Sequence, residues 1–344
     1  MYCKIIIFLF IACFIPVQAA EVVVRDMAGR DVKCPSPCKV ERIFATSHAM
    51  SCVLLALAPE KLCALNRAFT PEDKVYLGDV VDKKPVLGGW LGSGKPTNSE
   101  SFLSLRPQIV FAPEYKRGGN GKKIQKVIKR FGIPLLYADI NDLGKMPEAL
   151  IFIGKVIGAD KRASVLAAAS KELLNRISKI GKNGVKVYYA AGPDGLSSYS
   201  GRSPETEVIY LAGAGNVLDK NVGENVSGKN RRVTVNIESL IKRDPDLIIV
   251  NSPATVKYIK SNPAWNSVSA VKKGRVYPIP LHPVSWVNRP PSFPRLLGVM
   301  WLANIIDSKA VTDEELNNST KKFYKVFYNC ELTDEILKKL LSGE

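Results

Sequence analysis

The sequence has few histidines, few acidic residues for its length and no long apolar run beyond its N-terminus. Its 344 residues include two histidines and no Gly-x-Ser-x-Gly motif, which argues against a hydrolytic triad. The 32 acidic residues stand against 49 basic ones, a formal net charge of +17. A hydrophobic share of 46% with 24% charged residues excludes disordered, collagen-like and small disulfide-rich chains. The length allows two domains.

The apolar run that follows Lys4 is typical of a secretory signal peptide. Ile5–Ile15 is too short to span a bilayer comfortably, and small residues up to Ala19 suit a cleavage site. We predict that residues 1–19 are removed and that the mature protein is periplasmic; a lipoprotein anchored at Cys13 is the second alternative. A basic chain often binds nucleic acid, but export argues against that partner. The lysines run in scattered clusters, one of them in a lysine-rich C-terminal tail.

Five of the seven cysteines follow the signal peptide. Cys34-Pro-Ser-Pro-Cys38 brackets a tight loop, for which we predict a local disulfide in an oxidising compartment. The pairing of Cys52, Cys63 and Cys330 stays open.

An internal repeat is the most informative feature of the chain. Glu-Ser occurs at Glu100 and again at Glu238, and Pro107 and Pro245 each fall seven residues after the glutamate, directly before an apolar strand. The pattern predicts a short helix, a proline that ends it and a strand buried on both faces. Thr97 stands three residues before Glu100, which fits a capping box. Two copies indicate two lobes of similar build.

The rest of the chain alternates strands with helices, which favours parallel sheets covered by helices. Between the lobes, residues 146–180 are rich in helix formers and predict one long backbone helix, continuous or broken once at Gly154 or Gly158. The fold class is therefore α/β, with two Rossmann-like lobes of mainly parallel sheet joined by that helix. The expected divisions after the signal peptide are a first lobe (20–142), a connecting helix (143–182), a second lobe (183–306) and a helical C-terminal extension (307–344), packed against one lobe.

The signal peptide, the two lobes joined by a helix and the paired Glu-to-Pro segments resemble the helical-backbone periplasmic binding proteins of ABC importers. The resemblance covers residues 24–306. It implies a substrate-binding protein, not an enzyme, that works with an ABC transporter permease as a monomer, without a catalytic cofactor and without nucleic acid. It also implies that Glu100 and Glu238 dock on permease arginines; the alternative is that both are helix N-terminal acids that favour the helix dipole.

The ligand should lie between the lobes, at the carboxyl ends of their strands. Polar and aromatic residues on the loops there can hold a large, anionic or aromatic chelate. The candidate ligand-binding residues are His48, Trp90, Tyr115, Arg202, His282, Trp286 and Arg289. His48 and His282 are also candidate metal ligands, with a structural role as the alternative for each.

Gly89–Lys95 has the spacing of a phosphate-binding loop, but Pro96 replaces the required Ser or Thr, so we reject nucleotide chemistry. The leading hypothesis for the ligand is an iron–siderophore or other metal chelate. The second is an oxyanion such as molybdate or tungstate, followed by nickel or haem. A secreted α/β enzyme is the alternative from another class.

Overall fold

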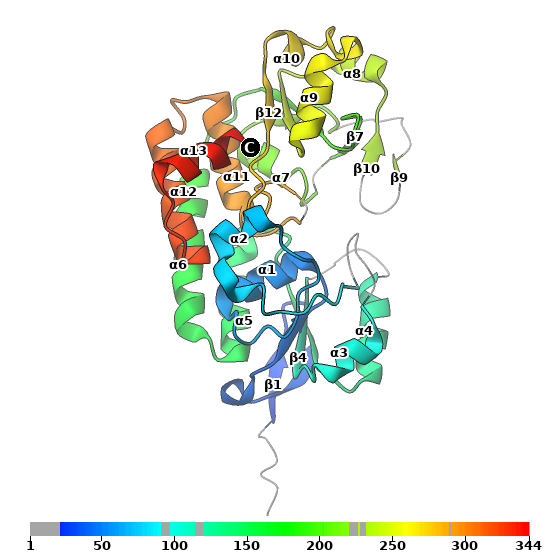
Figure 1. Cartoon of the computed structure of the whole chain (residues 1–344), viewed down its shortest axis with the longest axis vertical. Helices are drawn as coiled ribbons and strands as arrows, with labels where there is room; N and C mark the ends of the chain where they lie inside the picture. Colours follow the sequence, from blue (N-terminus) through cyan, green and yellow to red (C-terminus); the bar gives the residue numbers. More distant parts are fainter. Residues whose placement is uncertain are drawn as a thin grey trace, which may run out of the picture.

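The computed structural model describes residues 21–90, 97–113, 120–201, 203–219, 226–227, 232–288 and 290–343. They form two α/β lobes, the first in the lower half of Figure 1 and the second in the upper half. This confirms the predicted fold class. No helix within the described ranges is long and apolar enough to cross a membrane.

The first lobe contains a parallel sheet in the order β3–β4–β5, preceded by an antiparallel hairpin of β1 and β2. Isolated parallel bridges from Ile43 to Leu62 and from Leu65 to Val86 extend this sheet beyond β3. The elements of this lobe are β1 (Glu21–Arg25), β2 (Asp31–Pro35), β3 (Ile43–Ala45), α1 (His48–Leu57), α2 (Pro71–Leu77), α3 (Ser99–Ser104), β4 (Ile109–Pro113), α4 (Asn120–Arg130), β5 (Leu135–Ala138) and α5 (Met146–Ile157).

The second lobe contains a parallel sheet in the order β12–β11–β6–β8 and a small antiparallel sheet in the order β7–β10–β9. The small antiparallel sheet and the β1–β2 hairpin were not expected from the sequence. The elements of this lobe are β6 (Lys186–Ala190), β7 (Ser197–Tyr199), α7 (Glu207–Leu211), β8 (Gly215–Asn216), β9 (Val226–Ser227), β10 (Arg232–Thr234), α8 (Ile237–Arg243), β11 (Leu247–Val250), α9 (Pro253–Ser261), α10 (Ser269–Lys272), β12 (Val276–Pro278) and α11 (Arg295–Ile306).

One hydrophobic core runs through both lobes. Alternate residues of a strand point to opposite faces of its sheet. Ile109 of β4 and Leu247 of β11 therefore point into a shared core, which α1, α5, α6 (Asp160–Ile177) and α11 also line. Val110 and Ile248, one residue further along each strand, point into separate cores on the outer faces of the two sheets. The lobes are thus joined by packing as well as by the chain.

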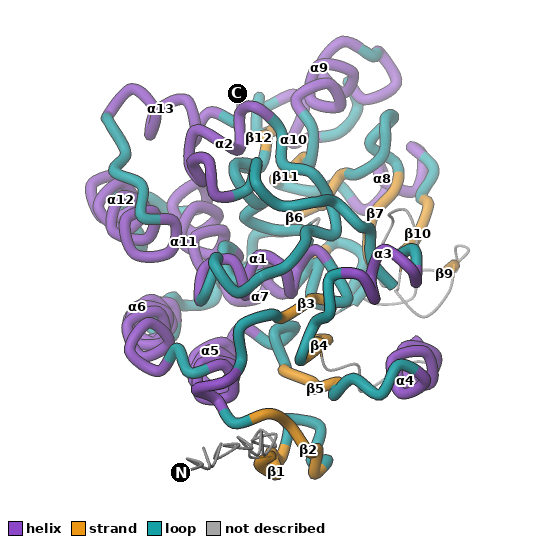
Figure 2. Tube along the Cα trace, turned by 60° about the horizontal axis from the view of Figure 1, so that its bottom comes forward, coloured by secondary structure: helices purple, strands orange, loops and turns teal. Residues whose placement is uncertain are grey.

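The connection between the lobes is two helices, not one. The predicted helix is broken at Gly158, whose φ of +69° ends α5. A Cβ there would lie 2.9 Å from the carbonyl oxygen of Pro37, so glycine also allows a close approach to the first lobe. Helices α5 and α6 lie side by side (Figure 2). Because α5 packs on the first lobe, the bridging element is α6 alone, whose 18 residues span about 27 Å.

The C-terminal extension is helical, as expected, and consists of α12 (Asp313–Tyr328) and α13 (Asp334–Ser342). It does not pack against a single lobe: α12 contacts α6, α11 and also α2 of the first lobe. Arg176 on α6 binds both carboxylate oxygens of Glu315, with 2.9 Å from Nη2 to Oε2. The tail is also not basic, because residues 307–344 contain six Lys and Arg against eight Asp and Glu.

The two copies of the repeat have the same local structure. Asn98 and Asn236 are the N-caps of α3 and α8, and each side-chain oxygen accepts hydrogen bonds from backbone N–H groups in the first turn. The capping-box prediction for Thr97 is therefore wrong by one residue. Arg106 and Asp244, the residues before the two prolines, both adopt positive φ, +48° and +42°. The sequence repeat is thus a structural repeat.

The residue after each proline binds the chain at the start of a neighbouring parallel strand, directly before β3 in the first lobe and at the first residue of β6 in the second. The Gln108 Oε1 atom accepts from the backbone N–H of Arg42 at 2.9 Å, and the Asp246 Oδ2 atom accepts from that of Lys186 at 2.8 Å. The side-chain amide of Gln108 in the first lobe and the carboxylate of Asp246 in the second thus accept equivalent backbone hydrogen bonds.

The predicted Cys34–Cys38 disulfide is not present: both thiols are free. Cys34 is buried on β2, whereas Cys38 is exposed in a short 3-10 helix, with its Sγ 3.3 Å from the Ser36 Oγ. The turn between them therefore points the two thiols into different surroundings.

Candidate functional site

In the first lobe, buried polar groups collect where β3 ends and α1 begins. The Asn66 side chain donates to the carbonyls of Ala45 at 2.9 Å and Gly88 at 2.7 Å. Trp90 N–H donates to the Thr46 carbonyl at 3.0 Å, which fixes the start of the glycine-rich loop against this strand end. A Cβ on Gly89 would lie 2.9 Å from both Asn66 and Thr46, so the loop can approach only as glycine. The described part of the loop is therefore held by the strand end.

His48 is the first residue of α1, behind the N-cap Ser47, which accepts from Met50 N–H at 3.3 Å. Its ring packs against Phe69 with centroids 5.3 Å apart. Burial and, to a smaller extent, nearby Arg67 lower the pKa of His48 to about 4, against the opposing effect of Asp73. The imidazole is therefore neutral near pH 7. Its buried Nδ1 has no hydrogen-bond partner.

Other buried polar atoms without a partner occur in both lobes, and two of them directly follow a parallel strand: Thr46 after β3 and Asn251 after β11. In the first lobe they are the hydroxyls of Thr46 and Thr97, which flank the glycine-rich loop. In the second lobe they are the Ser198 hydroxyl on β7 and the Asn251 Oδ1 directly after β11. A buried polar atom without a partner is costly, so such atoms are normally kept for a ligand or an ordered water. They mark the region between the carboxyl ends of the strands as the candidate site.

The loop after β12 carries contacts from the second lobe back to the first. The Ser292 hydroxyl donates to the carbonyl of Ala49, in the first turn of α1, at 3.3 Å. The Nδ1 of His282 lies 2.7 Å from Oδ1 of Asp73 on α2. Asp73 is itself fixed, because its carboxylate accepts from Thr70 N–H at 2.8 Å in a capping box. The lobes therefore meet directly beside His48.

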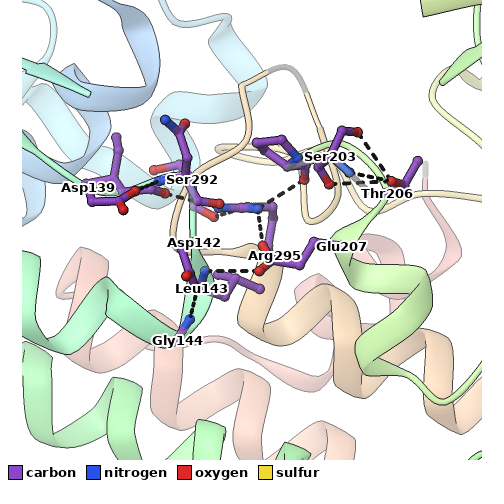
Figure 3. A network of polar contacts seen from close by, with 12 residues as sticks. Asp139, Asp142, Leu143, Gly144, Ser203, Thr206, Glu207, Ser292 and Arg295 are labelled. Carbon is purple, nitrogen blue, oxygen red and sulfur yellow. Dashed lines mark hydrogen bonds and ion pairs between the residues drawn. The ribbon is translucent and has the colours of Figure 1, made fainter. Parts of the chain in front are cut away.

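Arg295 forms the innermost contact between the lobes (Figure 3). Its fully buried guanidinium donates to the Glu207 carboxylate at 2.6 Å and to the carbonyls of Ile140 at 3.1 Å and Asn141 at 2.8 Å. Two more bonds reach the carbonyls of Pro204 at 3.0 Å and Ser292 at 3.2 Å. Burial lowers the pKa of Arg295 and raises that of Glu207, and the pair opposes both effects. We call these contacts the Arg295 clasp.

The structure describes four of the seven predicted ligand-binding residues. His48 lies at the strand ends with an unpartnered nitrogen, as a ligand contact requires. Trp90 is partly buried, with its ring 5.0 Å from that of Phe102 and 5.8 Å from that of Phe44, so most of its surface is packing. The candidates outside the described residues are Tyr115, Arg202 and Arg289.

Trp286 is a correction to the predicted site. Its side chain is 0% exposed and its indole N–H donates to the Tyr324 hydroxyl at 3.2 Å, so it belongs to the core. The sequence placed it in the site because aromatic and polar residues cluster on a loop expected at the carboxyl end of a strand, but Tyr324 of α12 packs against that loop.

His282 has the structural role that the sequence left as its alternative. Besides the bond to Asp73, its ring stacks on Tyr76 at 6.4 Å and its carbonyl accepts from Tyr324. No group of three or more His, Cys, Asp or Glu side chains that could hold a metal ion occurs in the described part of the chain. The described residues therefore do not support His48 and His282 as ligands of a bare metal ion.

Glu100 and Glu238 are exposed at the N-terminal ends of α3 and α8. These helices lie on the same side of the molecule, opposite α6 and α12, in both views (Figures 1 and 2). Both glutamates are thus accessible and equivalent.

Sequence reasoning missed Asp73, Glu207 and Arg295, which connect the lobes. An ion pair between positions 88 residues apart leaves no local pattern. For Asp73, the sequence offers the capping-box pattern Thr-x-x-Asp that begins at Thr70. This pattern predicts the start of a helix, but it does not predict a contact with the other lobe.

The chain is similar to known proteins over most of its length. Residues 90–282 match the family model described as periplasmic binding protein. A solved ABC transporter solute binding protein from Sulfurospirillum deleyianum superimposes with a TM-score of 0.81 at 30% identity, covering 92% of this chain and 98% of that one.

Two curated relatives are more distant. The molybdate-binding protein MolA of Haemophilus influenzae is 24% identical over 259 residues, 69% of this chain and 71% of MolA. Its molybdate-bound structure superimposes with a TM-score of 0.71 at 20% identity, covering 91% of this chain and 99% of that one. The vitamin B12-binding protein of Pectobacterium carotovorum is 23% identical over 262 residues, 74% of this chain and 83% of that protein.

Proposed function

The chain belongs to the periplasmic binding protein family, and from this membership we propose that it captures a metal-containing, anionic solute between its lobes and delivers it to an ABC transporter permease. The observation that carries this proposal is the set of buried, unpartnered polar atoms in both lobes, among them Thr46 and His48 after β3 and Asn251 after β11. Hydroxyls and a neutral imidazole donate hydrogen bonds to an anion, and they carry no negative charge that would repel it. The first candidate is an iron–siderophore or other metal chelate.

A molybdate- or tungstate-type oxyanion is the second candidate. The similarity to a molybdate-binding protein supports it, and so does the start of α1, where backbone N–H groups and the helix dipole favour an anion. The unpartnered His48 nitrogen lies in that first turn. Nickel as a bare ion is disfavoured, because the described residues hold no cluster of metal-ligating side chains.

Tryptophan-fluorescence titration with ferric chelates, molybdate, tungstate and Ni²⁺ tests the ligand class directly. We expect saturable binding of one anionic class, weakened about tenfold or more in His48→Ala by loss of a buried hydrogen bond. Phe69→Leu is the matched control, because it changes the packing beside His48 without removing a polar atom. Binding of Ni²⁺ alone, with none of the anions, would contradict the proposal.

We further propose that Glu100 and Glu238 dock on the permease, one from each lobe. Both are exposed, and equivalent caps and strands fix both in position. The double charge reversal Glu100→Lys and Glu238→Lys should abolish uptake and leave solute affinity unchanged. Glu314→Lys with Glu335→Lys on α12 and α13 is the control, since it makes the same charge change on the opposite side. Normal uptake by the first variant would refute docking.

A further inference from the structure

The positive charge of the protein is concentrated in two segments of the chain, each of which contains one copy of the repeat. Residues 99–130 contain eight Lys and Arg against two Asp and Glu, and residues 226–275 contain ten against three. These two segments therefore carry charges of +6 and +7, together thirteen of the seventeen in the chain. Two of the lysine clusters expected from the sequence, at 122–129 and 229–232, lie within these segments.

Six exposed basic residues of these segments lie on or beside elements that share one side of the molecule. We call this set the basic side; its members in the first lobe and on β10 and α8 are Arg106, Lys126, Lys129, Arg130, Arg232 and Lys242. Figures 1 and 2 both place α3, α4, α8 and β10 opposite α6 and α12. Lys257 and Lys260 on α9 extend the charge over the end of the second lobe.

The acidic residues in the same segments do not neutralise it. Asp244 accepts from the backbone N–H and hydroxyl of Ser269 at 3.0 and 2.8 Å, and Asp246 accepts from the backbone N–H of Lys186. Glu100 and Glu238 remain exposed. No member of the basic side forms an ion pair with another described residue.

The opposite side differs in that several of its lysines form ion pairs. The lysines of α12 pair with acids on neighbouring elements: Lys321 with Asp334 and Lys322 with Glu172, each at 2.6 Å. Acidic residues are thus placed where α6, α12 and α13 meet, and are few where α3, α4 and α8 lie. The asymmetry is a property of the fold and not of the composition alone.

We propose that the basic side binds the anionic headgroups of a phospholipid bilayer, so that both lobes approach the membrane with Glu100 and Glu238 facing it. The charges are spread along two lobes on exposed helix faces, which suits an extended anionic plane better than one small ion. The inference rests on the proposed function, because delivery to a permease brings the protein to a membrane. The positive charge of the basic side attracts an anionic surface.

Vesicle co-sedimentation with the mature protein tests this inference. We expect binding to vesicles of phosphatidylglycerol and phosphatidylcholine, none to phosphatidylcholine alone, and loss of binding as salt screens the attraction. A basic-side variant should lose at least about tenfold in affinity for the anionic vesicles. It combines Lys126→Gln, Lys129→Gln, Arg130→Gln and Lys242→Gln. The matched control is Lys161→Gln, Lys171→Gln, Lys179→Gln, Lys182→Gln, which removes four exposed charges on or just after α6 and should bind as the parent does.

Three outcomes would overturn the inference: equal loss in both variants, parental binding by the basic-side variant, or equal binding to neutral vesicles. Retained vesicle binding with slower association of the anionic solute would assign the basic side to solute steering instead. Circular dichroism confirms that both variants fold. Solute titration separates this test from the test of the proposed function. If the protein binds vesicles but binds none of the solutes, the proposed function is refuted and the membrane inference is not.

Discussion

Replacing Arg295 with methionine should destabilise the protein more than any other single loss of charge at the junction between the lobes. The side chain is 0% exposed and makes five hydrogen bonds, to one carboxylate and four carbonyls. Methionine fills a similar volume but leaves the Glu207 carboxylate without its charged partner, with only the Leu143 N–H at 3.3 Å as a donor, and removes the guanidinium donor from the four carbonyls. Removing one partner of a buried ion pair costs about 3–5 kcal/mol. For a protein of this size, that lowers Tm by about 5–10 °C.

Urea and thermal unfolding followed by circular dichroism measure the loss. Arg162→Met is the matched control, because Arg162 is a half-buried arginine that donates to the carbonyls of Ala56 at 3.0 Å and Phe327 at 3.4 Å and has no carboxylate partner. We expect it to cost about 1–2 kcal/mol, because it removes two ordinary hydrogen bonds.

Glu207→Gln separates charge from hydrogen bonding at the clasp. Burial raises the pKa of Glu207, so its charge is costly in the fold and its removal recovers part of what the lost pairing costs. We expect a loss of about 1–2 kcal/mol, below that of Arg295→Met. A loss from Arg295→Met no larger than that from Arg162→Met would refute the view that the clasp holds the lobes together.

Three further predictions concern titration, thiols and helix packing. The pKa of His48 in the folded protein, about 4, lies below its ordinary value of 6.5, so on acidification the unfolded chain binds a proton before the folded protein does. The free energy of unfolding should therefore fall by about 2–3 kcal/mol as the pH drops from 6.5 to 4.5. His48→Gln should abolish that part of the loss, as measured by urea unfolding. Cys38 should react rapidly with a thiol reagent at pH 8, whereas Cys34 and Cys63 should react slowly because burial raises the pKa of each to about 11; a missing Cys38 signal would indicate the disulfide instead. Gly154→Ala should cost about 1–3 kcal/mol, because its Cβ would lie 2.2 Å from that of Ala163 on α6, whereas Gly181→Ala, with open space around it, should be neutral by the same unfolding assay.

The sheets could be predicted from the sequence because a strand buried on both faces is a continuous apolar run bounded by polar residues. Lys186–Ala190, Leu247–Val250 and Leu135–Ala138 are strands of that kind. The repeat around Glu100 and Glu238 could be predicted for the same reason, since its cap, proline and strand are local. Local patterns therefore identify the elements.

The packing of those elements could not be predicted in the same way. The turn at Gly158 depends on its close approach to Pro37, more than a hundred residues earlier in the chain. The burial of Trp286 depends on Tyr324, which belongs to the C-terminal extension. A proline-rich loop looks the same in sequence whether a ligand or a helix covers it, and here the described part of the loop is covered by α12.

The shared core and the polar contacts between the lobes limit how the protein can exchange its solute. A wide opening would separate the Arg295 clasp, the His282–Asp73 pair and the faces of the core that both sheets line. Each 100 Å² of apolar surface exposed in such a motion costs about 2.5 kcal/mol. The 18-residue α6 also packs against α1, α11 and α12 along its length, so it is not a free hinge. Small tilts that leave these contacts intact can still change the spacing of the unpartnered atoms on the two lobes, and hydrogen bonds are sensitive to shifts of a few tenths of an ångström. Capture and release of a solute therefore require the strand ends to move only slightly, with the junction preserved.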